Sequence, residues 1–160
     1  MTELAPVELK IGDNAANFDL PRDGGGHVRL ADFAGKPLVI YFYPKDDTTA
    51  CTTESISFTA LAADFAKADA ALLGVSPDSV KSHDKFVKKH ALSIPLAADE
   101  EKTMAMAYGV WREKSMYGRT YMGVVRSTFL IGADGRTVRI WDKVKVAGHA
   151  EEVLGAAKEL

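Results

Sequence analysis

The single cysteine of the 160-residue chain, Cys51, is the side chain with the greatest capacity for covalent chemistry. It follows a continuous apolar run at residues 37–43, which ends at Pro44, and it precedes apolar residues at helical spacing. These patterns predict a buried strand and then a helix that begins near Cys51. A thiol in the first turn of a helix faces unpaired backbone N–H groups and the positive end of the helix dipole, and both favour the thiolate. The sequence therefore predicts a nucleophilic cysteine.

The residues around Cys51 distinguish this interpretation from the commoner one, in which a lone cysteine is a small buried hydrophobic residue. Its neighbours in the sequence carry hydroxyl and carboxyl groups: Thr48, Thr49, Thr52, Thr53 and Glu54. The Thr48 hydroxyl can donate a hydrogen bond to a thiolate or to a substrate oxygen, and Pro44 stiffens the entry to the loop. Glu54 stands where the acid of a capping box would stand if the thiol occupied the cap position.

Arg126 is a second candidate, because a permanent cation stands near the start of an otherwise apolar strand predicted over residues 124–131. A charge in such a place needs a partner. The partner is either a surface carboxylate or an anionic site at the end of the sheet where Cys51 begins its helix, and the sequence leaves both open.

Composition and charge exclude several classes of function. With 160 residues and 47% hydrophobic composition, we expect one soluble domain over residues 1–160. The 20 basic and 22 acidic residues give a net charge of -2 without a basic cluster, which disfavours nucleic-acid and membrane partners. One cysteine excludes an intramolecular disulfide and a Cys-rich zinc site. Residues 1–6 lack a targeting pattern, so the cytoplasm is the expected location.

The remaining patterns predict an α/β order of elements. A second buried strand at residues 70–75 follows the Cys51 helix, which implies a right-handed crossover. The other predicted elements are an N-terminal hairpin of residues 18–20 and 27–30, a helix over 80–90, a strand at 95–98, a short helix over 101–108, a strand pair at 124–131 and 136–141, and a closing helix over 150–160. The aromatic and Met-rich segment 111–123 lacks periodicity and is predicted to be a long loop, either functional or a cover for the core edge.

The four histidines give no metal site. His83 and His90 share a helical stripe but lie seven residues apart, about 10 Å along a helix, too far to share one ion. They are predicted to be packed or surface side chains. His27 and His149 have no companion ligands in the sequence and receive no role.

The spacing Pro44-x-x-x-Thr48-x-x-Cys51 after an apolar strand resembles the active-site signature of the peroxiredoxins. Residues 41–48, 51–54, 114–118 and 126–131 are similar to the peroxiredoxin Q subgroup, also called bacterioferritin comigratory protein. The resemblance covers most of the chain in order. It implies a thioredoxin-like α/β fold, with a central mixed sheet flanked by helices and an N-terminal β-hairpin extension.

By the same resemblance, Cys51 is the peroxidatic nucleophile that attacks hydrogen peroxide or an organic hydroperoxide and becomes a sulfenic acid, with no cofactor. Arg126 would hold the thiolate and stabilise charge on the leaving oxygen. Thr48 would orient the peroxide, Pro44 would shield the sulfur from water, and Glu54 would position an arginine.

The chain departs from the subgroup at Ile56, where many members carry a second, resolving cysteine. This implies a one-cysteine peroxiredoxin whose sulfenic acid is reduced by an external thiol, such as glutathione with glutaredoxin, thioredoxin or another small thiol. It also implies easier overoxidation of Cys51, and the subgroup suggests a monomer. A non-catalytic redox sensor is the alternative from another class. A thiol-disulfide oxidoreductase is a weaker rival, because that chemistry usually needs two cysteines.

Overall fold

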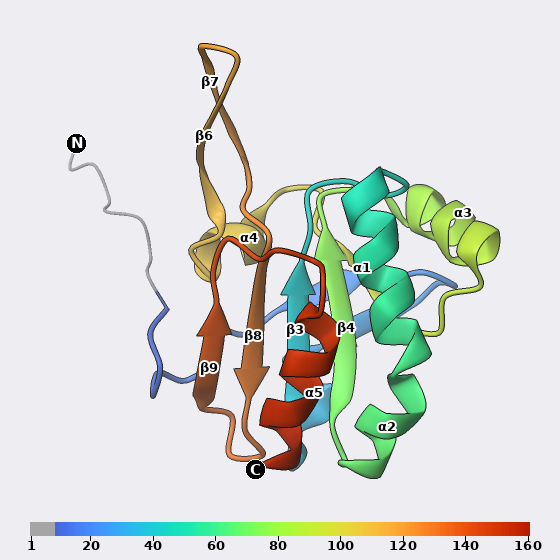
Figure 1. Ribbon diagram of the computed structural model, residues 1–160, viewed down its shortest axis with the longest axis vertical. Helices are drawn as coiled ribbons and strands as arrows, with labels where there is room; N and C mark the ends of the chain where they lie inside the picture. The colour runs from blue at the N-terminus through green and yellow to red at the C-terminus, as the bar shows by residue number, and fades with distance from the viewer. Residues whose placement is uncertain (1–8) are drawn as a thin grey trace.

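The computed structural model describes residues 9–160, so the expectation about residues 1–6 lies outside the described part. A five-stranded mixed sheet forms its centre, in the order β5-β4-β3-β8-β9 (Figure 1). The strands are β3 Leu38–Phe42, β4 Ala71–Ser76, β5 Leu96–Ala98, β8 Ser127–Ile131 and β9 Thr137–Trp141. The β3, β4 and β5 strands are parallel, and β8 and β9 continue the sheet in antiparallel fashion. The predicted mixed α/β fold is confirmed.

Helices cover both faces of this sheet. On one face, α1, α2, α3 and α5 contribute to a single hydrophobic cluster with alternate residues of β3; on the other, α4 and the N-terminal hairpin do the same. In Figure 1, α1 and α5 lie in front of the sheet. The helices are η1 Leu30–Phe33, α1 Thr49–Ala60, α2 Ala62–Lys67, α3 Val80–His90, α4 Thr103–Ala107 and α5 His149–Lys158.

The central strand β3 explains why the sheet has two buried faces. All five of its residues are buried. Because successive side chains of a strand point to opposite faces, Val39 and Tyr41 join the cluster beneath α1, whereas Ile40 and Phe42 join the other. The loop from β3 to α1 leaves the carboxyl end of this strand, so the sheet itself positions Cys51.

The prediction of a loop over residues 111–123 is wrong. Strands β6 Trp111–Met116 and β7 Arg119–Val124 pair in antiparallel fashion and project beyond the main sheet as a hairpin (Figure 1). Tyr117 and Gly118 form its turn, both with positive φ (53° and 76°), as in tight two-residue hairpin turns. Most side chains of the hairpin are exposed, so the alternation of apolar and polar residues that reveals a strand is absent.

The N-terminal hairpin is confirmed, with β1 Asp19–Pro21 paired to β2 His27–Arg29. The single helix predicted to follow Cys51 is instead divided at Leu61 into α1 and α2. Among residues 9–160, no helix is both long and apolar enough to cross a membrane. In the same described part, no cluster of three or more His, Cys, Asp or Glu side chains could hold a metal ion.

Candidate active site

Cys51 lies in the first turn of α1, as its sequence position predicts. The helix begins at Thr49, and the cap residue is Thr48, with extended backbone angles. The expected capping box with the thiol in the cap position is therefore wrong, because Cys51 is already the third residue of the helix. Its side chain is only 1% exposed, at the carboxyl end of β3.

Arg126 links the two acidic groups of this region. One guanidinium nitrogen donates to Cys51 Sγ at 3.2 Å, and the other donates to Glu54 Oε1 at 2.7 Å. Of the two kinds of partner that the sequence left open for this arginine, the structure shows the buried one at the sheet end, since Glu54 is buried and lies one helical turn after Cys51. Residue 126 precedes β8, which pairs directly with β3, and this pairing brings positions distant in sequence together.

Burial dominates the electrostatics of Glu54. Desolvation raises the pKa of this carboxyl to about 7, although the charge and hydrogen bond of Arg126 lower it. Its second oxygen, Oε2, has no hydrogen-bond partner. For Arg126, burial lowers the pKa, but the attraction of Glu54 and Cys51 outweighs that effect, so the pKa is raised and the guanidinium stays charged. A permanent cation therefore lies against the sulfur at every physiological pH.

Thr48 and Pro44 belong to the loop in front of the thiol. The Thr48 hydroxyl donates to the Lys45 carbonyl at 2.8 Å, so its proton is used within the loop and its oxygen is left to accept a hydrogen bond from a bound molecule. Thr48 is exposed and Pro44 is half-buried. Within the described residues, no hydrogen bond joins the Thr48 side chain to the Cys51 sulfur.

Side chains of helix α3 bind the same loop through hydrogen bonds and ion pairs. The sequence did not predict these contacts. Asp46 binds His83 and Asp47 binds His90, at 2.7 and 2.8 Å. Lys89 adds an ion pair with Asp47 at 2.7 Å. The sequence shows two adjacent aspartates and two histidines seven residues apart, but no pattern in it indicates that the aspartates contact the histidines.

The other polar groups beneath α1 pair with one another. Tyr41 Oη and Ser55 Oγ lie 3.0 Å apart, and Thr128 Oγ1 lies 2.8 Å from His149 Nε2. Burial lowers the pKa of His149 to about 4, so its ring is neutral at physiological pH. These two buried pairs lie between the central sheet and the helices α1 and α5.

The β6–β7 hairpin brings another cation to the vicinity. Lys114 Nζ donates to the Val124 carbonyl at 2.9 Å. Desolvation and the charge of Arg126 lower the pKa of Lys114, whereas Cys51 raises it. The sequence did not distinguish a functional role for segment 111–123 from a role in covering the core. The structure shows that this segment places the charge of Lys114 close enough to Cys51 for the two groups to interact electrostatically.

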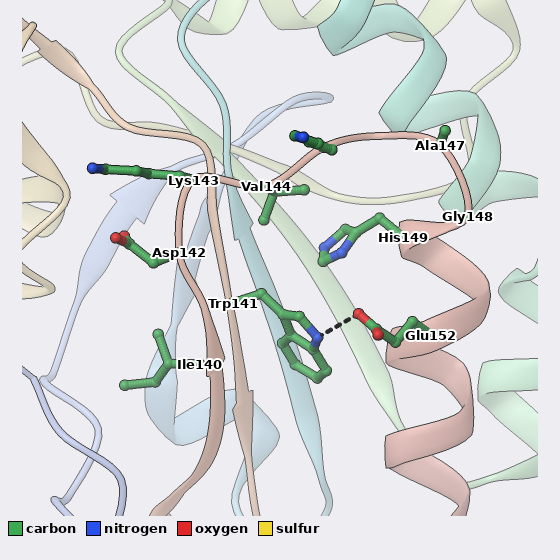
Figure 2. A pocket seen from close by; sticks show the side chains of 10 residues that line it. Ile140, Trp141, Asp142, Lys143, Val144, Ala147, Gly148, His149 and Glu152 are labelled. Atoms are coloured by element: carbon green, nitrogen blue, oxygen red, sulfur yellow. Dashed lines mark hydrogen bonds between the residues drawn. The ribbon is translucent and has the colours of Figure 1, made fainter.

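A pocket of about 460 Å³ lies beside this region, between β9 and the start of α5 (Figure 2). Trp141, His149 and Glu152 line it, and the Trp141 indole donates to Glu152 at 2.8 Å. The loop that lines it contacts the candidate site through the backbone, where Val144 N–H donates to the Arg126 carbonyl at 2.9 Å. Neither Cys51 nor Arg126 lines this pocket. Of its other polar side chains, Asp142 binds Arg112 and His149 binds Thr128.

A thiol in the first turn of a helix, held by an arginine at the end of a thioredoxin-like sheet, defines the class of protein. The AhpC/TSA family model matches residues 11–140. The chain therefore belongs to the AhpC/TSA family, and it is a peroxiredoxin, a thiol-dependent peroxidase that reduces hydroperoxides with a thiol reductant.

Within that family the chain is of the Bcp or peroxiredoxin Q type. It is 52% identical to peroxiredoxin Bcp of Xanthomonas campestris, over 90% of this chain and 91% of the relative, and 45% identical to that of Bacillus subtilis, over 96% and 98%. The solved peroxiredoxin Q of X. campestris superimposes with a TM-score of 0.88 at 46% identity, covering 97% of this chain and 98% of that one. A structure of the X. campestris bacterioferritin comigratory protein, described by its alkyl peroxide reduction activity, gives 0.85 at 49% identity, covering 89% and 90%.

Proposed function

We propose that Cys51 reduces hydrogen peroxide and organic hydroperoxides through a sulfenic acid, which an external thiol then reduces. The thiolate attacks the hydroxyl oxygen of the hydroperoxide, and the S–O bond forms as the O–O bond breaks. The other oxygen leaves as hydroxide or alkoxide and takes a proton from solvent to become water or an alcohol. Sulfur is oxidised by two electrons and the peroxide is reduced by two. The observation that carries this proposal is the 3.2 Å contact between Arg126 and Cys51 Sγ at the start of α1.

Each of the other candidate residues has a function that fits its position. The nitrogen of Arg126 that faces the sulfur lies where negative charge moves onto the leaving oxygen, and a preoriented cation lowers the barrier most there. The Thr48 hydroxyl oxygen can accept a hydrogen bond from the peroxide, because its own hydrogen is donated to the Lys45 carbonyl. Pro44 has no backbone N–H and keeps one side of the thiol loop apolar.

The return step needs thiols from outside the chain, because the chain has one cysteine. One thiol displaces water from the sulfenic acid to form a mixed disulfide, and a second thiol releases Cys51 as the thiolate. Structures of the X. campestris relative carry Cys-to-Ser substitutions at two different positions, so that protein has two cysteines where this chain has one. Glutathione with glutaredoxin, and thioredoxin, are the reductants to compare, with organic hydroperoxides as substrates because the X. campestris protein is described by its alkyl peroxide reduction.

Stopped-flow measurement of Cys51 oxidation tests the peroxide step. We expect a second-order rate constant orders of magnitude above that of a free thiol, no reaction in Cys51→Ser, and a loss of about a hundred- to a thousandfold in Arg126→Ala. Arg136→Ala, at an exposed position in the turn between β8 and β9, is the matched control and should keep the full rate. A rate like that of an ordinary thiol would remove the enzymatic reading of Cys51.

Steady-state peroxide consumption separates the catalyst from the alternative, a non-catalytic redox sensor. Sustained turnover with glutathione and glutaredoxin, or with thioredoxin, supports the catalyst and identifies the reductant. One equivalent of peroxide consumed and no more, with every reductant, favours the sensor. Mass spectrometry under excess peroxide without reductant should show the sulfinic acid of Cys51 accumulate.

A further inference from the structure

His83 is a fully buried histidine whose two ring nitrogens both face acceptors. Nδ1 lies 2.7 Å from Asp46 Oδ2, and Nε2 lies 2.9 Å from the carbonyl oxygen of Ala97 in β5. A carboxylate and a carbonyl accept hydrogen bonds and donate none, so both nitrogens must carry protons to satisfy them. A neutral ring would set a lone pair against one of these oxygens in a buried place, which is costly. Because the Asp46 carboxyl also accepts hydrogen bonds from the Tyr43 and Ser82 hydroxyls, the contacts favour an imidazolium beside an ionised Asp46.

Asp46 completes the pair from inside the candidate active-site loop. Its carboxylate is buried and also accepts from the Tyr43 hydroxyl at 2.6 Å and from the Ser82 hydroxyl at 2.8 Å. Its backbone N–H donates to Asp78 at 2.7 Å. One residue of the loop is thus fixed from the end of β3, from α3 and from the turn before α3.

The charges that face His83 set its protonation. They are the carboxylates of Asp46 and Asp78; the phenol ring of Tyr43 lies 6.5 Å away, and β5 contributes only the Ala97 carbonyl. Burial by itself lowers the pKa of His83, but its hydrogen bond with Asp46, the negative charges of both aspartates and the bond to Ala97 raise it above the usual value.

The pair lies where it can determine the geometry of the peroxide step. Asp46 is two residues from Pro44 and two from Thr48, and the bond from Thr48 to Lys45 makes the intervening loop a closed turn. A displaced Asp46 therefore displaces both residues relative to Cys51. Misplacement by about 1 Å is enough to slow an enzymatic step about a hundredfold.

We propose that the His83 imidazolium is a positioning residue of this peroxidase, which acts through Asp46 to hold Pro44 and Thr48 in register with Cys51. This inference rests on the proposed function of those three residues. Its consequence is a dependence on pH: the pair is intact below the pKa of His83 in the folded protein and is lost as the pH rises through that value. The peroxide step should therefore slow in alkaline solution.

Nitrogen NMR of the unmodified protein tests the protonation without any mutation. With ¹⁵N-labelled histidine, we expect both ring nitrogens of His83 to show the protonated shift at pH 7 and to change together in alkaline solution. His149, whose pKa is lowered to about 4, is the internal reference for a neutral ring. A neutral His83 at pH 7 would overturn the proposal.

Stopped-flow rates of Cys51 oxidation across pH 6 to 10 test the positioning. His83→Gln should lose about ten- to a hundredfold in rate and should lack the alkaline decline. The control is His27→Gln, an exposed histidine in β2 whose partner is Asp19, and it should behave as the unmodified protein. Lys114 near the site also has a lowered pKa, and any decline that its titration causes persists in His83→Gln.

A double-mutant cycle measures the energetic coupling between Asp46 and His83 apart from the effect of each residue alone. Asp46→Asn leaves a buried unpaired cation and should be slower than the double variant Asp46→Asn with His83→Gln, in which two neutral side chains face each other. Additive losses, or a His83→Gln variant with the full rate and the alkaline decline, would overturn the proposal.

If His83→Gln does not fold, measurements on the unmodified protein test the proposal instead. A rate of Cys51 oxidation that stays constant over the pH range in which the His83 NMR signal titrates would reject the proposal. If peroxide does not oxidise Cys51 in the unmodified protein at all, the proposed function is wrong as well. The NMR experiment still reports the protonation of His83 in that case, because it does not depend on peroxide.

Discussion

The two faces of the central sheet satisfy their buried polar groups in different ways. Beneath α1 and α5, side chains pair with side chains, as in Tyr41 with Ser55 and Thr128 with His149. On the opposite face, buried side chains bind the backbone. The Tyr108 hydroxyl donates to the Ala16 carbonyl at 2.6 Å, and the Asp99 carboxylate accepts from the N–H groups of Met104 and Ala105 at 3.1 and 2.8 Å.

This difference determines what a mutation does on each face. A backbone acceptor remains when a neighbouring side chain changes, whereas a side-chain partner can be lost and leave a buried group unpaired. On the Cys51 face the lost partner is close to the reacting sulfur. We therefore expect mutations on that face to change both stability and rate, and mutations on the opposite face to change stability alone.

The largest expected effect is on the opposite face. Phe129→Ala removes a ring that is 2% exposed and packs against Phe42 and Tyr108, with centroid distances of 5.7 and 5.3 Å. We expect a loss of about 3 to 5 kcal/mol in the free energy of unfolding, measured by urea denaturation, with little change in the rate of Cys51 oxidation at temperatures where the variant is folded. Val138→Ala, an exposed site in β9, is the control. A rate that falls in step with stability would refute the separation of the two faces.

Glu54→Gln should give the next largest effect, on the Cys51 face. The pKa of Glu54 is about 7 in the folded protein and near the ordinary 4.5 when unfolded, so the native state holds a proton that the unfolded state loses between these values. This group therefore makes the protein less stable as the pH rises through that window, by up to about 3 kcal/mol. The glutamine variant should lack this decline and should be slower with peroxide, because Arg126 loses its anionic partner.

Urea denaturation at a series of pH values measures the decline, and stopped-flow oxidation measures the rate. Glu101→Gln, an exposed acid before α4, is the control and should change neither. A Glu54→Gln variant with the same pH-dependent stability as the unmodified protein would show that the carboxyl is ionised throughout and that the bond to Arg126 outweighs burial.

The sequence predicted the parts of this site that depend on local patterns. The apolar composition of residues 37–43 predicts the central strand. Apolar residues at helical spacing follow Cys51, and this pattern predicts that Cys51 lies in the first turn of a helix. Arg126 was singled out because a cation at the start of an apolar strand is unusual. In each case the signal lies within one element and follows from its periodicity.

The parts that the sequence missed depend on contacts between elements. The pairing of Asp46 with His83 joins a loop to a helix 37 residues away, and no periodicity links the two. The β6–β7 hairpin was missed for a related reason, because strands exposed on both faces have no core to impose alternation. Whether a lone histidine is charged or neutral depends on its partners in space, so its position in the sequence could not give it.

His149 gives the opposite pH dependence to His83 on the same face of the sheet. Burial lowers its pKa to about 4, against about 6.5 when unfolded, so the unfolded state gains a proton first as the pH falls. Stability should therefore be lost between about pH 6.5 and 4, by about 2 kcal/mol after allowance for partial solvation. His149→Gln should remove that loss, as urea denaturation at pH 4.5 and pH 7 would show. An unchanged difference between the two pH values would mean that the ring is solvated in the native state.

The smallest expected effect compares one hydroxyl on each face directly. Tyr41→Phe leaves Ser55 without its partner, and Tyr108→Phe leaves the Ala16 carbonyl without its donor, so each should cost about 1 to 2 kcal/mol in urea denaturation. Only Tyr41→Phe should also slow Cys51 oxidation, by a few-fold, because Ser55 adjoins Glu54 in α1. Tyr117→Phe, 97% exposed at the hairpin turn, should change neither quantity. Equal rates in the variants of Tyr41 and Tyr108 would show that the side-chain pairs beneath α1 stabilise the fold without tuning the site, and would confine the control of the rate to Arg126, Glu54 and the loop held by α3.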